Sequence, residues 1–290
     1  YIVKVHAEFR KANYTNASTY ALSAWIEQGR KEANKIETEP FNEKKLRLYI
    51  EDFIALTLET REIFLPKLKY MRSLFGIAFV ILPHISKTYV QGATKWLSPN
   101  KVILQLSTRG KRIDIFWFTF FHELGHILLY SKKDMFIEYE NYSNSESEKK
   151  ANNFASNTLI PPKKYKTFIS SSKDFTEDSI IRFSNDIKIN PAIVIGRLAH
   201  DDLINYNKFS YLRPNLNWDE IILYSGIISP IKKIKGQEIR KKFLNFEFLP
   251  KEMNISGLQV ADLCATPIGG NYIGKKVKRF ISFSLFSMIY

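Results

Sequence analysis

Five consecutive residues, His122-Glu123-Leu124-Gly125-His126, carry the clearest chemistry in this sequence. The two histidines are four positions apart, so on a helix they share one face. Two imidazoles on one face can bind one metal ion, and a glutamate beside the first histidine can reach a water molecule on that ion. The spacing therefore predicts a zinc site, held by His122 and His126, with Glu123 as its general base.

The motif lies in the apolar stretch IFWFTFFHELGHILLY, which predicts a buried helix over residues 115–130. Two histidines and a glutamate in such a helix need polar partners, and a metal ion supplies them. Asp114 directly precedes the stretch and is expected to cap the helix. The charged and polar residues of the stretch would be costly in lipid, so we expect no membrane span here.

A catalytic zinc takes three protein ligands and keeps one position for water. The third ligand is expected from a downstream helix, and the candidates are Glu138, Glu140, Glu146 and Glu148. No histidine lies close downstream, since the only one after the motif is His200. Glu148 is favoured because it begins an apolar helix that can pack on the motif helix. Glu138 and Glu140 lie in a polar stretch that is expected to be a loop. An ordinary role for Glu148, as a first-turn acid facing the helix dipole, stays open.

This ligand set suggests peptide hydrolysis. Zinc would acidify a bound water and polarise a peptide carbonyl. Glu123 would take the proton of the water and pass it to the leaving amine. The oxyanion needs a further donor, and the sequence leaves four candidates open: Tyr130, Tyr139, Tyr142 and His200.

The elements around the motif predict an α+β fold. Residues 1–65 show the spacing of amphipathic helices. The run IAFVILPHI and residues 93–97 and 102–106 predict a small antiparallel sheet of about three strands before the motif helix. Further helices follow, one capped by Thr176 and one entered at Pro191.

Composition and charge narrow the class of protein. The chain has 290 residues and one cysteine, Cys264, which excludes an internal disulfide framework and a cysteine-rich zinc site. A reducing compartment is therefore expected. The net charge of +14 suggests an anionic partner such as nucleic acid, or simply a solvated basic face. Because the first residue is Tyr1, we expect a preceding part of the protein.

Four stretches resemble the ImmA/IrrE family of zinc metallopeptidase-like proteins in order and spacing: GATKWLSPNKVILQLSTR, FWFTFFHELGHILLY, ESEKKANNFASNTLIP and INPAIVIGRLAHDDLI. They look most like the branch described as HigA-like antitoxins, which is fused to an XRE-type helix-turn-helix domain. The resemblance implies metal ligands at His122, His126 and Glu148 and a catalytic glutamate at Glu123. It also implies a zincin-like fold and a cytoplasmic role in repressor cleavage, stress response or toxin–antitoxin control. Tyr130 departs from the family, in which relatives often carry histidine there.

Three regions are expected along the chain. Residues 1–60 form a helical linker after the missing DNA-binding domain, residues 61–213 form the zinc metallopeptidase domain, and residues 214–290 form a basic tail. Within the tail, GLQVADLCATPIG resembles the end of an uncharacterised nuclease-like family. Asp262 would be the acid of that motif, although a simple structural acid in the remnant of another domain is the preferred interpretation.

Together these patterns predict a zinc-dependent endopeptidase whose substrate is a regulatory protein of the repressor or antitoxin type. The alternative is a non-catalytic antitoxin or transcriptional regulator with a structural metal site. DNA could be a further partner through the missing N-terminal domain, and no membrane partner is expected.

Overall fold

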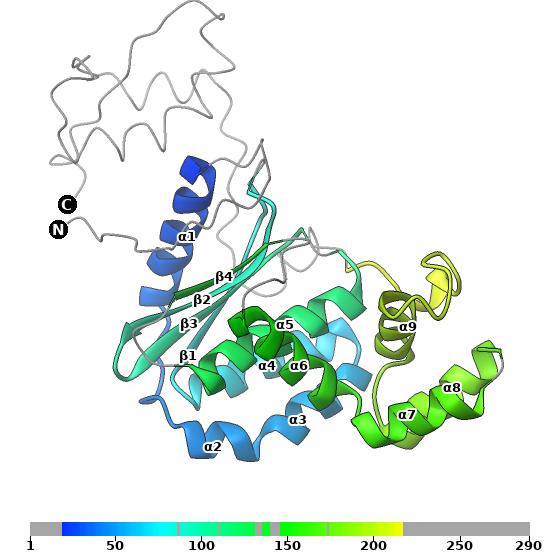
Figure 1. The fold of residues 1–290 in the computed structure, drawn as a ribbon. Helices are drawn as coiled ribbons and strands as arrows, with labels where there is room; N and C mark the ends of the chain where they lie inside the picture. The colour runs from blue at the N-terminus through cyan, green and yellow to red at the C-terminus, as the bar shows by residue number, and fades with distance from the viewer. Residues whose placement is uncertain are drawn as a thin grey trace, which may run out of the picture. The chain divides into compact units, whose positions relative to one another are not determined.

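The computed structural model describes residues 19–85, 88–109, 111–130, 135–139, 146–172 and 174–216 (Figure 1). Contacts divide the chain into two units, and the motif lies in the unit formed by Gln28–His84 and Tyr89–Ser229. The fold described here is that of this unit. The predicted tail, including Asp262, lies outside the described residues from residue 217 onward.

A four-stranded mixed sheet forms one layer of the unit, in the order β1-β3-β2-β4. Its strands are β1 (Ile77–Leu82), β2 (Val90–Ser98), β3 (Lys101–Ser107) and β4 (Met135–Tyr139). β2 pairs antiparallel with β3 and β4, whereas β1 pairs parallel with β3. The prediction of a purely antiparallel sheet was therefore wrong for β1. Strand periodicity shows which residues form a strand but does not show which neighbour that strand will pair with.

β4 also corrects a second prediction, because it lies within the polar stretch that was expected to be a loop. Its backbone pairs with β2 through Thr94 and Phe136. A strand of five residues is too short to reveal a period of two among polar neighbours. Glu138 belongs to this strand, and Glu140 lies outside the described residues.

The motif helix α5 (Ile113–Leu129) packs against one face of the sheet (Figure 1). The contact includes Phe79 of β1, whose ring centroid lies 5.8 Å from that of Phe120 on α5. Nearly every residue of α5 is buried, as its apolar sequence predicted. The α+β fold with a buried motif helix is thus confirmed.

Further helices surround this layer. They are α2 (Glu43–Leu48), α3 (Ile50–Ala55), α4 (Arg61–Ser73), α6 (Glu146–Leu159), α7 (Pro162–Ser171), α8 (Glu177–Ile187) and α9 (Pro191–His200), with 3-10 turns η1 (Leu56–Leu58) and η2 (Ser210–Leu212). Another helix, α1 (Thr19–Asn34), begins in the other unit, which includes Tyr1–Glu27, and ends in this one. Thr176 caps α8 through a capping box, and Pro191 is the first residue of α9, both as predicted.

Asp114 does not cap α5; the residue at the cap position is Arg112. The Asp114 carboxylate is buried in the first turn, where Oδ2 lies 3.1 Å from Nε of Arg213 and 3.2 Å from Nη2 of Arg112. Charge-assisted bonds to two guanidinium groups are stronger than a single bond to a backbone N–H group. The carboxylate therefore ties the start of α5 to Arg213, near the end of the described chain.

The hydrophobic core continues across residue 60, where the sequence suggested a boundary between a linker and the metallopeptidase domain. Phe53 of α3 is 1% exposed, and its ring centroid lies 5.4 Å from that of Phe120 on α5. Arg47 of α2 donates a hydrogen bond to the carbonyl of Leu128 at 3.0 Å. The helices before residue 60 therefore help to support the motif helix. The boundary itself stays a prediction.

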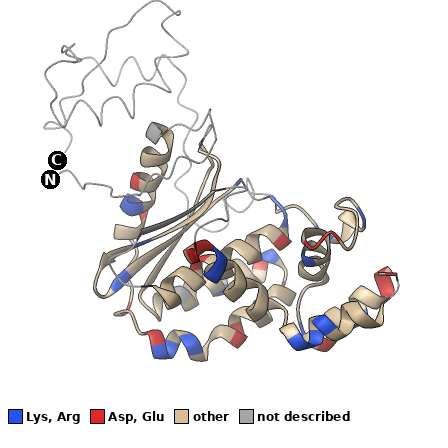
Figure 2. Cartoon of the chain, viewed as in Figure 1, with Lys and Arg blue, Asp and Glu red and all other residues tan. Residues whose placement is uncertain are grey.

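Basic and acidic residues both occur on the surfaces of the described helices (Figure 2). On α2, Arg47 pairs with Glu43 at 2.9 Å, and Lys164 of α7 pairs with Asp186 of α8 at the same distance. Exposed pairs of this kind contribute little to stability. Within the described residues, no helix combines the length and apolar character that crossing a membrane requires.

The core contact of Phe53 leads to a stability prediction. Replacing Phe53 with alanine should lower the free energy of unfolding by about 3–5 kcal/mol, because it leaves a cavity against Phe120. Chemical denaturation followed by circular dichroism measures this change. Leu48→Ala is the control, since Leu48 is 78% exposed, and it should change stability by less than about 0.5 kcal/mol. Equal effects of the two variants would show that α3 is not part of the core.

Candidate metal centre

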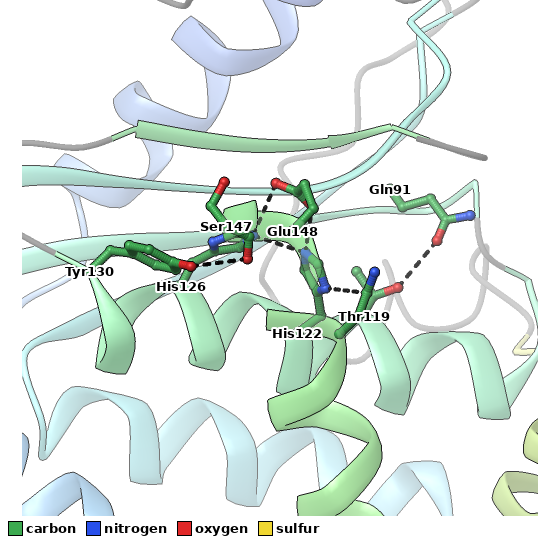
Figure 3. Close-up of polar contacts among 8 residues, drawn as sticks. Gln91, Thr119, His122, His126, Tyr130, Ser147 and Glu148 are labelled. Carbon is green, nitrogen blue, oxygen red and sulfur yellow. Dashed lines mark hydrogen bonds and ion pairs between the residues drawn. The ribbon is translucent and has the colours of Figure 1, made fainter. Parts of the chain in front are cut away.

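His122 and His126 occupy one buried face of α5 (Figure 3). The four-residue spacing places their rings together, with 4.6 Å between ring centroids. The two Nε2 atoms are 2.9 Å apart. The helix thus directs one nitrogen of each ring toward the same point.

Glu148 completes this group from the first turn of α6 (Figure 3). Its Oε2 lies 3.2 Å from Nε2 of His122, and its Oε1 lies 3.3 Å from Nε2 of His126. The donor atoms of the three residues all lie within 4.8 Å of one another. The structure therefore brings together the three ligands that the resemblance implied. Glu146, another candidate from the sequence, is exposed.

Gly125 allows α6 to come this close to α5. A side-chain Cβ at this position would lie 3.3 Å from the Cα of Ala151 and 3.1 Å from a ring carbon of Phe154. Glycine weakens a helix, so its presence in the middle of α5 is explained by this contact. Sequence reasoning assigned no role to Gly125, although a glycine inside a buried helix was a usable signal.

Asn152 orients His122 from behind. Its Oδ1 lies 2.8 Å from Nδ1 of His122, and a carbonyl oxygen can only accept a hydrogen bond. In the tautomer with its proton on Nδ1, His122 donates to Asn152, and its Nε2 keeps a lone pair on the side of Glu148 and His126. Asn152 lies one turn after Glu148 on α6, so one helix supplies both a ligand and an orienting group. Asn152 is not among the site residues that the sequence predicted.

Tyr130 stabilises the entry to α6. Its hydroxyl donates to the carbonyl of Ser147 at 3.3 Å, and its ring centroid lies 5.9 Å from that of His126. The residue thus contacts both helices of the centre. His200, another candidate oxyanion donor, is 82% exposed at the end of α9 and contacts Asp201. The side chains of Tyr139 and Tyr142 lie outside the described residues, so the oxyanion donor stays open.

The protonation states of the group suit a metal ligand set. Burial alone would raise the pKa of Glu148, but hydrogen bonds and charge interactions with His122 and His126 outweigh it and lower this pKa to about 2. Burial lowers the pKa of His126, which favours a neutral ring. A carboxylate and neutral imidazoles are the forms that bind metal. A set of two histidines and one glutamate is a known zinc ligand set, so these residues fit zinc.

Glu123 lies beside the group and is 0% exposed. Gly92 of β2 covers its carboxylate, and a Cβ at position 92 would lie 2.3 Å from Oε1 of Glu123. A larger residue at this point would therefore displace the carboxylate from its present position. The sequence predicted no function for Gly92, since no local pattern shows that β2 passes over α5.

The arrangement is zincin-like, with the His-Glu-x-x-His helix under a small mixed sheet and a third ligand on the next helix. Residues 95–198 match the family model of Peptidase_M78, the IrrE N-terminal-like domain. The match runs from β2 to α9 and includes His122, Glu123, His126 and Glu148. No curated protein matches the chain. The family match supports the resemblance to ImmA/IrrE proteins and suggests a metallopeptidase. The antitoxin branch and the relationship of the tail stay predictions.

The contact between Asn152 and His122 leads to a prediction about metal affinity. Asn152→Ala should weaken zinc binding about 10–100-fold, because His122 loses the partner that fixes its ring. Competition with a chromophoric chelator measures the affinity. Asn153→Ala is the matched control, since the neighbouring Asn153 is exposed, and it should leave the affinity unchanged. Equal affinities in the wild type and Asn152→Ala would contradict the orienting role.

Proposed function

We propose that this protein is a zinc-dependent endopeptidase that cleaves a regulatory protein of the repressor or antitoxin type in the cytoplasm. The observation that carries the proposal is the convergence of His122, His126 and Glu148, with Glu123 directly following the first of them in the chain. The match to the Peptidase_M78 family model supports the same reaction class. The resemblance to antitoxin-branch proteins suggests the kind of substrate.

Each polar residue of the centre has a distinct role in this proposal. His122, His126 and Glu148 hold the zinc, which when bound polarises the scissile carbonyl and acidifies the attacking water. Glu123 accepts the proton of the attacking water and later donates it to the leaving amine. Asn152 and Tyr130 keep the ligands and the start of α6 in position. Gly92 leaves the space that the Glu123 carboxylate needs.

A second candidate function is a non-catalytic antitoxin or regulator with a structural metal. Burial favours it, because His122, Glu123, His126 and Glu148 are all buried. Structural zinc sites are closed, whereas catalytic ones keep an open position. The net charge of +14 would suit a regulator that acts on DNA together with a preceding domain.

Loss of Glu148 tests the ligand set. Glu148→Ala should reduce zinc from one ion per chain to well below half occupancy after dialysis, because two histidines alone bind zinc weakly. Elemental analysis by mass spectrometry gives the stoichiometry. Glu146→Ala, which removes an exposed carboxylate of the same helical turn, should keep full occupancy. Full zinc in Glu148→Ala would remove Glu148 from the ligand set.

Loss of Glu123 separates the two candidate functions. Glu123→Gln should retain zinc and reduce cleavage of a repressor or antitoxin that is encoded by a neighbouring gene and co-expressed with it. The expected loss is about 10²–10⁴-fold, because the glutamine side chain cannot accept the proton of the attacking water. Gel electrophoresis and mass spectrometry of the co-expressed repressor or antitoxin detect the cleavage products. Cleavage at the wild-type rate would exclude Glu123 as the base. If the zinc-loaded wild type cleaves none of the proteins encoded by neighbouring genes, the non-catalytic regulator becomes the favoured function.

A further inference from the structure

β2 departs from regular geometry directly above the metal centre. Val90 pairs with Tyr139 of β4, and Gly92 pairs with Glu138, so two steps along β2 match one step along β4. The extra residue is Gln91. A register shift of this kind is a β-bulge, and bulges change the direction of a side chain.

The bulge places Gln91 on the side of the sheet that faces α5. In a regular strand, Gln91 and Gly92 would point to opposite faces. Here Gly92 faces Glu123, and Gln91 also reaches α5, where its Oε1 accepts a hydrogen bond from the Thr119 hydroxyl at 3.3 Å (Figure 3). Neighbouring residues of β2 therefore both point toward the motif helix.

Thr119 connects this contact to the metal centre. It lies three residues before His122 and four before Glu123, so all three share one side of α5. Its side chain is buried, as are those of His122 and Glu123. Through Thr119, α5 thus holds the carboxamide of Gln91. The same helix carries His122, His126 and Glu123.

The bond from Thr119 determines which end of the carboxamide is available. Because Oε1 accepts from Thr119, the Nε2 group points away from Thr119, and within the described part of the chain it makes no hydrogen bond. Gln91 is half-buried, whereas His122 and Glu123 are fully buried. Gln91 therefore presents two N–H donors at the margin between the buried centre and solvent.

We propose that Gln91 is a substrate-binding residue whose Nε2 donates a hydrogen bond to a backbone carbonyl of the bound peptide, next to the scissile bond. Thr119 is the positioning residue that fixes the direction of this donor. The proposal rests on the peptidase function proposed above. A peptide entering a buried centre loses water from its carbonyls, and an oriented donor replaces the lost hydrogen bond.

Two zinc-binding probes test the proposal on the full chain loaded with zinc. Acetohydroxamate offers a metal-binding group with no peptide carbonyl beyond it. The hydroxamate of N-acetyl-triglycine carries the same group together with three backbone carbonyls and no side chains. Calorimetric titration of both probes separates contact with the peptide backbone from contact with the metal.

Gln91→Met keeps the shape of the side chain and removes its donors. It should weaken binding of the triglycine hydroxamate about 3–10-fold, the value of one hydrogen bond, and leave acetohydroxamate binding unchanged. Thr119→Val should weaken the triglycine probe by a smaller factor, about 2–5-fold, because Gln91 remains but is less ordered. Gln28→Met, which removes a carboxamide that bonds Glu32 on α1, is the control and should change neither affinity.

The outcomes distinguish this proposal from the peptidase function. If Gln91→Met binds both probes as the wild type does, or weakens both equally, Gln91 only ties β2 to α5 and the proposal is wrong. If the zinc-loaded wild type binds neither probe, the metal has no open position. Both the peptidase function and the role of Gln91 then fail, and the structural metal site is supported.

Discussion

The close approach of α6 to α5 is the constraint on which the metal centre depends. Gly125 and Ala151 lie at the contact, and a Cβ at position 125 would lie 3.3 Å from the Cα of Ala151, closer than such atoms normally pack. This contact brings Glu148 to His122 and His126 and brings Asn152 to the far side of the His122 ring. A small displacement of α6 would therefore remove a ligand and an orienting group together.

The apolar surroundings of the metal centre strengthen the interactions among its polar side chains. α5 packs against the sheet and against α3, so its polar side chains are held away from water. In such an environment a carboxylate and two imidazoles need one another or a cation. β2 adds the second constraint, because Gly92 lies directly over Glu123 and the bulge at Gln91 turns a carboxamide to the same side. The packing of α5 and α6 thus determines where the metal ligands lie, and β2 determines which groups surround Glu123.

Local patterns were enough to predict the parts of this structure that follow from spacing. The four-residue interval of His122 and His126 gave the shared face, and the start of an apolar helix pointed to Glu148. Predictions failed where strand pairing decides the outcome, as for the parallel β1 and for β4. Gly92, Gln91 and Asn152 were missed for a related reason: each acts on a residue far away in the chain, and no local pattern encodes such a contact.

X-ray absorption at the zinc edge of the purified full chain tests the central claim most directly, because it reports the ligand types at the metal. The account predicts a four-coordinate ion with nitrogen and oxygen ligands at about 2.0–2.2 Å and the scattering pattern of two imidazole rings. A sulfur ligand, or a shell that lacks the imidazole pattern, would contradict the assignment of His122, His126 and Glu148 as the metal centre.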